Sequence, residues 1–250
     1  MLETLPRPTI FAHRGASAHA PENTLAAFEL ALAQGADGIE LDVKLSADGH
    51  AVVIHDATVD RTTDGHGRVR DMSLADLRTL DAGAFFAEKY RGEKIPTLEE
   101  VFDALGKRLF INVELTNYRT PGDHLVETVC MLIKKCGLQK QILFSSFLAS
   151  NLSKARGLLP EVPRGLLALN GLLGGWARSF GFVFGKYQAL HPYLNDVTPQ
   201  QVQRVHRLER RVHVWTVNAG EDMRRLFDWG VDAIFTDDPQ LAVQVRKGAA

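Results

Sequence analysis

Short apolar runs alternate with longer segments of helical periodicity along most of the chain. The apolar runs predict strands at residues 9–13, 38–45, 109–115, 141–146, 165–169, 188–192, 212–217 and 233–236. The periodic segments predict helices at residues 23–34, 98–105, 122–136, 148–158, 199–210 and 220–229. This alternation indicates a parallel sheet wrapped by helices. Eight strands in 250 residues favour a TIM-type (β/α)₈ barrel, and an open doubly wound sheet is the alternative because the alternation does not encode strand order.

Residues 57–95 interrupt this alternation with turn residues and charges. The segment has too few apolar residues to fold alone, so we expect an insertion over one end of the barrel, after the second strand region, within a single domain of residues 1–250. Ser73 followed by Asp76 three positions later predicts the start of a short helix inside the insertion.

Composition and charge narrow the classes of partner. The chain is 45% hydrophobic and 24% charged, and 29 basic against 30 acidic residues give a formal net charge of −1. This balance gives no electrostatic reason to expect a nucleic-acid partner, and no apolar run approaches the roughly 18 residues needed for stable membrane insertion. Cys130 and Cys136 are six positions apart on a predicted helix, so we expect free thiols. With an N-terminus that lacks a secretory signal pattern, this predicts a cytoplasmic location.

Acidic side chains are expected on the inner face of two strands. In the strand 38–45, alternation sends Glu40, Asp42 and Lys44 to one face and apolar residues to the other. The next predicted strand places Glu114 in the same way. Buried charges are costly without partners, and carboxylates are the ligands that hard divalent cations prefer. The three carboxylates therefore predict either a cation site at the C-terminal end of the barrel or an ion network neutralised by neighbouring basic residues.

Two histidines stand where a strand opens into a loop, which is the usual position of catalytic groups in this architecture. His13 ends the first strand, and His55 ends a run that returns after the turn 46–50. Imidazoles divide acid and base roles well near neutral pH. We therefore expect His13 and His55 to be catalytic. Structural or surface roles are expected for His19, His66, His191, His206 and His213.

Arg14, beside His13, indicates an anionic ligand because a guanidinium matches phosphate or carboxylate in a forked geometry. A divalent cation, an arginine and two histidines fit phosphate-ester hydrolysis. No G-x-G-x-x-G follows the first strand, so the usual motif of a dinucleotide-binding enzyme is absent. No G-x-S-x-G is present either, so the usual motif of a serine hydrolase is absent.

Eight short motifs occur in the order seen in one enzyme family. The chain reads "HRG", "PENT", "ELDV", "VVIHD", "RTTDGHGRV", "IPTLEEV", "NVEL" and "WTVN" between Ile10 and about Asp238. In this it resembles the glycerophosphodiester phosphodiesterases. The resemblance implies a TIM-type barrel with an insertion after the strand that ends at His55, and hydrolysis of a glycerophosphodiester to sn-glycerol 3-phosphate and an alcohol.

The resemblance also assigns roles to particular positions. It implies one divalent cation, Ca²⁺ or Mg²⁺, held by Glu40, Asp42 and Glu114. It implies general acid and base roles for His13 and His55, and contact between the phosphate and the arginine that follows His13. The attacking oxygen is either that of water or that of the substrate's own glycerol hydroxyl, which would form a cyclic phosphate.

Thr116 departs from the family pattern, which often has a lysine two residues after the third carboxylate. A threonine brings no positive charge to the phosphate. Lys44 or Arg119 is the expected substitute for that charge.

Several other positions have two interpretations. Trp215 lines the glycerol pocket or belongs to the core. Glu22 and Asn23 cap the first helix or brace the first histidine, with capping favoured for Asn23. Phe85 and Phe86 form an apolar wall beside the leaving group or pack the insertion onto the barrel.

Two alternative functions keep the same site. A lysophospholipase D would need an apolar groove beside the insertion, for which residues 171–184 are the candidate wall. A barrel that binds phosphodiesters without cleaving them is favoured only by Thr116.

Overall fold

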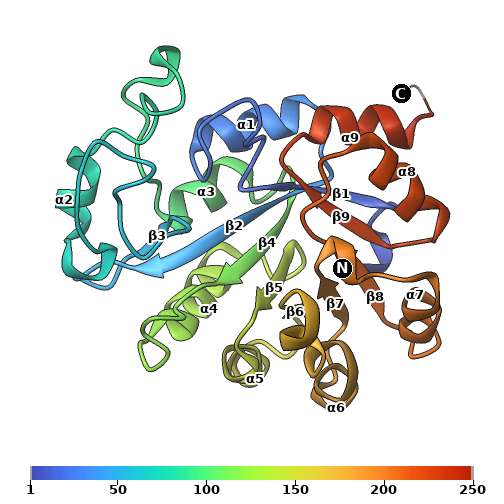
Figure 1. Ribbon diagram of the computed structural model, residues 1–250. Coiled ribbons are helices and arrows are strands. Elements are labelled where there is room, and N and C mark those ends of the chain that lie inside the picture. Colours follow the sequence, from blue (N-terminus) through green and yellow to red (C-terminus); the bar gives the residue numbers. More distant parts are fainter. Residues whose placement is uncertain (1, 249–250) are drawn as a thin grey trace.

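Eight parallel strands close into a barrel in residues 2–248, the part of the chain that the computed structural model describes (Figure 1). The barrel strands are β1 (Thr9–His13), β2 (Gly38–Leu45), β4 (Phe110–Leu115), β5 (Ile142–Ser146), β6 (Arg164–Ala168), β7 (Ala189–Pro192), β8 (Arg211–Val214) and β9 (Ala233–Thr236). They follow the order β1-β9-β8-β7-β6-β5-β4-β2, and β1 also pairs with β2. That last pairing closes the sheet, so the TIM-type barrel is confirmed and the open doubly wound alternative is wrong.

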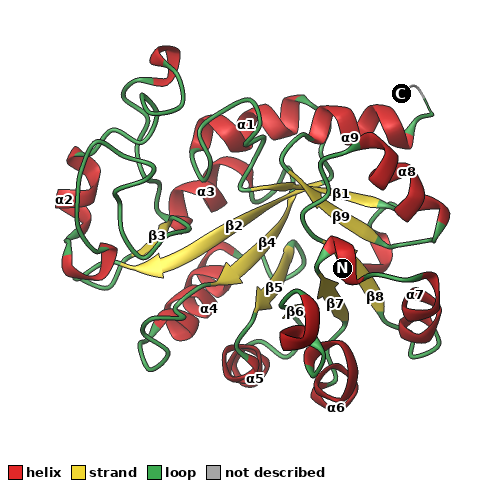
Figure 2. Cartoon of the chain, viewed as in Figure 1, coloured by secondary structure: helices red, strands yellow, loops and turns green. Residues whose placement is uncertain are grey.

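Helices surround the barrel, as Figure 2 shows. They are α1 (Leu25–Ala33), α3 (Leu98–Leu105), α4 (Leu125–Cys136), α5 (Ala149–Leu158), α6 (Phe182–Gly185), α7 (Pro199–His206), α8 (Gly220–Asp228) and α9 (Pro239–Arg246), with α2 (Leu74–Thr79) in the insertion. The six helices expected from periodicity are present, whereas α6 and α9 were not predicted. Among the described residues, no helix is both long and apolar enough to cross a bilayer.

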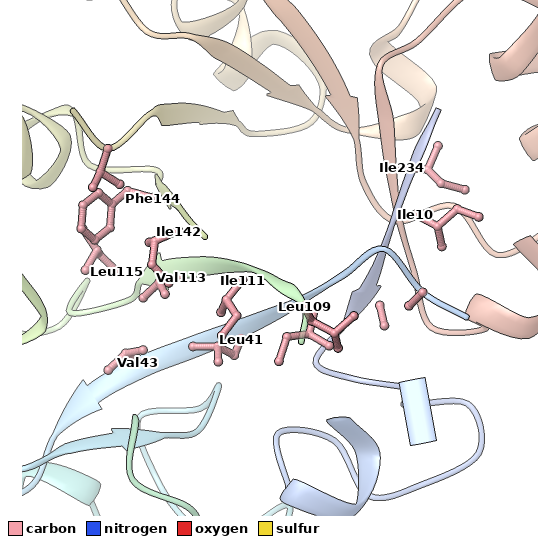
Figure 3. Close-up of a cluster of buried hydrophobic side chains, with 14 of the residues drawn as sticks. Ile10, Leu41, Val43, Leu109, Ile111, Val113, Leu115, Ile142, Phe144 and Ile234 are labelled. Atoms are coloured by element: carbon pink, nitrogen blue, oxygen red, sulfur yellow. The ribbon is translucent and has the colours of Figure 1, made fainter. Parts of the chain in front are cut away.

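The main core lies between the strands and the helices. Leu41 and Val43 of β2 point outward into it, together with Ile111 and Val113 of β4, and all four are buried (Figure 3). Burying a side chain of this size contributes about 1.5–3 kcal/mol. Because side chains alternate along a strand, the residues between them must point into the barrel. This alternation brings charged groups to the barrel interior.

The insertion extends from a short antiparallel strand, β3 (Ala51–Val53), which pairs with the end of β2. A small apolar cluster stabilises it, made of Val52, Ile54, Val59, Val69, Leu77, Ala82 and Ile95. The predicted capping pair is present at α2, where the Ser73 and Asp76 side chains each accept from the other's backbone N–H. Figure 1 places the insertion at the C-terminal end of β2.

Phe85 and Phe86 do not line the cavities beside His13 and His55, so they form no apolar wall there. Their rings contact each other edge-on, and Phe86 also contacts Tyr90. The Tyr90 hydroxyl donates to the carbonyl of His19, in the loop after β1. Tyr90 thus connects the insertion to the barrel side, whereas Phe85 and Phe86 are both more than a third exposed.

Gly165 on β6 leaves room for the buried ring of His191. A Cβ at this position would lie 2.1 Å from Nε2 of His191, and that ring is fully buried. We expect Gly165→Ala to lower the free energy of unfolding by about 2–3 kcal/mol, the cost of overpacking. Denaturant titration measures it. Gly157→Ala in α5 is the control, since a Cβ there meets nothing within 4 Å and alanine is the better helix former. Equal destabilisation of both variants would contradict this packing.

Candidate active site

Three carboxylates meet inside the barrel near its C-terminal end. Glu40 and Asp42 come from β2 and Glu114 from β4, and the register of these neighbouring strands sets Asp42 beside Glu114. One oxygen from each carboxylate lies within 4.8 Å of the others. The structure thus brings together the three acids singled out in the sequence.

Burial and mutual repulsion change the protonation of this cluster. Burial, together with the charges of Asp42 and Glu114, raises the pKa of Glu40 well above its usual range. Burial and the charge of Asp42 raise the pKa of Glu114 to about 8. Burial alone would raise the pKa of Asp42 as well, but the charges of Arg14, His55 and Lys44 and the hydrogen bond from Asn23 together outweigh it, and the pKa is lowered. Without a cation, the cluster therefore retains protons near neutral pH.

The cluster fits a hard divalent cation better than a structural ion network. Glu40 Oε1 and Asn112 Oδ1 are buried, and neither has a hydrogen-bond partner within the described residues. Unpaired buried oxygens are costly, and an all-oxygen donor set suits Ca²⁺ or Mg²⁺. The Lys44 ammonium does not supply the neutralising contact, because it donates to the carbonyl and hydroxyl of Thr116 at 3.1 and 2.7 Å.

Each candidate histidine is held by a carboxylate. Nδ1 of His13 lies 2.7 Å from Oδ1 of Asp237, and Nδ1 of His55 lies 2.7 Å from Oδ1 of Asp56. A carboxylate can only accept, so each imidazole donates from Nδ1 and keeps Nε2 as its reactive nitrogen. Both histidines line the same small cavity, of about 70 Å³, as the three acids.

The sequence reasoning missed the two aspartates that contact the histidines, Asp237 and Asp56. Burial alone would raise the pKa of Asp237, but hydrogen bonds from His13, Asn218 and Ser17 outweigh it and the pKa is lowered. Hydrogen bonds from Arg61 and His55 lower the pKa of Asp56. Both carboxyls are therefore anions near neutral pH. Asp56 follows His55 directly, which is a signal in the sequence, whereas nothing local links Asp237 to His13.

Arg14 sits at the edge of the acidic cluster in a left-handed backbone conformation, with φ of 58°. Its backbone N–H donates to Glu40, its Nη1 donates to Glu22 at 2.9 Å, and its Nε lies 3.5 Å from Asp42. Nε makes no hydrogen bond to any described residue. Burial alone would lower the Arg14 pKa, but Asp42, Glu22 and Glu40 raise it, so the guanidinium is a permanent cation at the cavity.

Glu22 and Asn23 act differently from the sequence expectation. The N-cap of α1 is Thr24, whose hydroxyl accepts from Ala27, so capping by Asn23 is wrong. The Asn23 amide donates to Asp42 at 3.0 Å. Glu22 accepts from both Arg14 and Arg61. Neither residue is bonded to a histidine; each holds a charged group of the site.

Aromatic side chains close the other side of the cavity. Trp215 lines it with Phe147, whose ring centroid is 5.7 Å away, and Leu167. The indole Nε1–H donates to the carbonyl of His191 at 2.8 Å, which fixes its plane. Trp215 thus lies in the wall of the cavity, in line with the first of its two interpretations. The His191 ring also lines this cavity, and its burial lowers its pKa to about 3, so the ring is neutral.

Thr116 positions the lysine of the site. Its hydroxyl donates to the carbonyl of Val43 at 2.8 Å and accepts from Lys44. Burial lowers the pKa of Lys44, and the charges of Asp42 and Glu114 oppose that change. Lys44, Thr116 and Arg119 all line a groove of about 760 Å³ that begins at His55, so both candidate substitutes for the missing lysine are on this side of the cavity.

Residues 171–184 lie away from the insertion, contrary to expectation. The segment follows β6, whereas the insertion follows β2 and β3, and the barrel order places β4 and β5 between β2 and β6. Several of its apolar side chains are exposed, including Leu172 at 99% and Phe184 at 76%. None of its residues lines the cavity or the groove beside His55. It is therefore not an apolar wall beside the insertion.

Comparison of the sequence with known proteins identifies one enzyme family. Residues 13–241 match the model of the glycerophosphoryl diester phosphodiesterase family. A glycerophosphodiester phosphodiesterase of Caldanaerobacter subterraneus subsp. tengcongensis is 42% identical over 241 residues, covering 96% of this chain and 98% of the relative. One of Bacillus subtilis is 36% identical over 251 residues, covering 95% of this chain and 86% of the relative.

Solved structures agree with the sequence relatives. An Oleispira antarctica phosphodiesterase, solved in complex with the product sn-glycerol-3-phosphate, superposes with a TM-score of 0.90 at 33% identity. The alignment covers 96% of this chain and 97% of that one. A glycerophosphodiester phosphodiesterase of Agrobacterium tumefaciens superposes with a TM-score of 0.80 at 32% identity, over 94% of this chain and 99% of that one.

Proposed function

Because this chain belongs to the glycerophosphoryl diester phosphodiesterase family and is an enzyme of that kind, we propose that it hydrolyses glycerophosphodiesters to sn-glycerol 3-phosphate and a free alcohol. One observation carries the proposal: two imidazoles, each oriented by a carboxylate, line the same cavity as three clustered acids. The sn-glycerol-3-phosphate in the Oleispira antarctica relative supports the identity of the product.

We assign the cation site to Glu40, Asp42 and Glu114, with Asn112 Oδ1 as a further oxygen in the same cavity. When bound, Ca²⁺ or Mg²⁺ would polarise a phosphoryl oxygen and offset the charge that develops on it. The Arg14 guanidinium lines the same cavity and would offset the negative charge of the phosphate. Trp215 and Phe147 give the glycerol carbons an apolar wall.

The two histidines divide the proton transfers. Nε2 of a neutral His13 removes the proton of the attacking oxygen. His55 enters the step as an imidazolium paired with Asp56, and its Nε2–H donates a proton to the departing alkoxide. We place the leaving alcohol at His55 because this histidine lines both the small cavity and the wider groove. If the glycerol hydroxyl attacks, a cyclic phosphate forms first and water opens it, and ³¹P NMR of the reaction detects that species.

Release of glycerol 3-phosphate tests the proposal. The purified protein, incubated with glycerophosphocholine or glycerophosphoethanolamine and Mg²⁺ or Ca²⁺, should release it, and excess EDTA should abolish the release. Tight calorimetric binding without turnover would favour the non-catalytic barrel instead. Because residues 171–184 line neither cavity nor groove, we expect a deacylated diester to react faster than its lysophospholipid.

Asp237 acts through His13 as a positioning residue. Asp237→Asn replaces an acceptor oxygen with a donor amide and removes the charge that holds the Nδ1–H tautomer. We expect kcat to fall about 100-fold with KM little changed. Steady-state kinetics with Asp238→Asn as the neighbouring control measures this. A change confined to KM would contradict the assignment.

A further inference from the structure

The groove beside His55 is much larger than the cavity that holds the acids. Its volume is about 760 Å³, against about 70 Å³ for the cavity. It is lined by the end of β2, by residues 55–58, by residues 68–70 of the insertion and by residues 116–120 after β4. His55 lines both spaces. A substrate whose scissile oxygen reaches His55 therefore extends its leaving alcohol into this groove.

Positive charge dominates the groove. Lys44, Arg68, Arg70 and Arg119 line it, against one acid, Asp56. That acid is already bonded to Arg61 and to His55.

Two of these cations lack a counter-charge. Within residues 2–248, the side chains of Arg68 and Arg119 have neither an ion pair nor a hydrogen bond, and both are exposed. Arg70 lies 3.6 Å from Asp71, and both of these side chains are more than half exposed, so that pair is weak.

We propose that this groove is a subsite for a leaving alcohol that carries its own phosphate. The inference rests on the function proposed above and specifies its substrate class. Arginine binds phosphate through paired N–H donors, and Arg68 and Arg119 have such donors free. A cationic alcohol such as choline is disfavoured by the same four charges, and an uncharged alcohol gains nothing from them.

A matched pair of substrates tests the subsite. Glycerophosphoglycerol and its derivative phosphorylated on the terminal hydroxyl of the leaving glycerol share the same scissile bond. We expect kcat/KM to be at least tenfold higher for the phosphorylated diester at low ionic strength, mainly through KM. The ratio should shrink in 0.5 M NaCl, where exposed charges are screened at about 4 Å. Equal or lower kcat/KM for the phosphorylated diester overturns the subsite but leaves the proposed function standing, whereas hydrolysis of neither substrate overturns the function itself.

Substitutions then locate the preference in the groove. Arg68→Ala combined with Arg119→Ala should bring the ratio of the two kcat/KM values close to one, and Arg68→Glu should reverse it. Arg156→Ala, on the helix after β5 and outside the groove, removes an arginine of the same charge and should leave the ratio unchanged. Thermal unfolding shows whether each variant is folded. A folded double variant that retains the tenfold ratio would overturn the assignment.

Discussion

His55→Ala lowers kcat on diesters with an ordinary alcohol leaving group by about 10³-fold, within the range expected for loss of a general acid or base. The reason is that an alkoxide leaves poorly without a proton, and His55 is the imidazole that faces the groove for the leaving alcohol. With a nitrophenyl ester of glycerol 3-phosphate the loss should be roughly tenfold or less, because nitrophenolate departs as an anion. Single-turnover and steady-state rates of the variant on the two substrates measure this difference. A larger loss on the alcohol diester than on the nitrophenyl ester identifies His55 as the general acid.

His13→Ala is the matched variant, because its proposed role as base is independent of the leaving group. We expect it to lose about 10²- to 10³-fold on both substrates. The His55 side chain is 41% exposed and that of His13 is 21% exposed. The free energy of unfolding of each variant should therefore lie within about 1 kcal/mol of that of the parent protein. Identical losses for both variants on both substrates would contradict the division of roles.

Removing the divalent cation makes stability strongly dependent on pH. The pKa of Glu114 is about 8 in the folded chain, against 4.5 ordinarily, and that of Glu40 is also raised. Between about pH 4.5 and pH 8, these two carboxyls bind more protons in the cation-free folded state than in the unfolded state, so their contribution to the free energy of unfolding falls as pH rises. For Glu114 the loss begins above about pH 4.5 and is complete above about pH 8, and its size is about 5 kcal/mol.

Calcium or magnesium should remove most of this slope, because the cation takes the place of the protons. Unfolding curves from pH 7 to pH 8.5, with EDTA or with excess cation, measure the effect. Below that range His191 and His213, whose pKa values burial lowers, take up protons in the unfolded chain and oppose the slope. Glu114→Gln should reduce the slope in EDTA, and Glu161→Gln, an exposed carboxyl outside the cluster, should not. A cation-free protein that gains stability with rising pH over this range would show that the acids are not held together as described.

Much of the site was predictable because its signals are local. Alternation along a strand puts Glu40 and Asp42 on one face whatever the rest of the chain does, and apolar neighbours make that face the inner one. His13 ends a barrel strand, and parallel strands present such ends on one side of a barrel. His55 does not end one, because it follows β3, which ends at Val53 and is antiparallel to β2. The cytoplasmic location stays a prediction.

Other parts of the site depend on chain closure. Asp237 is 224 positions from His13, and the two meet only because β9 pairs with β1. Asn23 contacts Asp42 instead of capping a helix, since Thr24 takes the cap. The segment 171–184 was misplaced for the same reason, because its apolar content says nothing about which strands separate it from the insertion.

Periodicity and residue chemistry thus specify the barrel, the inward acids and the imidazole that ends β1, because each is a property of a few consecutive residues. The partners of those groups, the orientation of each imidazole and the basic groove are set when residues 55–70 and 116–120 come to face one another across the C-terminal end of the barrel. Electrostatic and hydrogen-bonding energies depend on distances of a few ångströms, and distances between remote segments exist only in the folded chain.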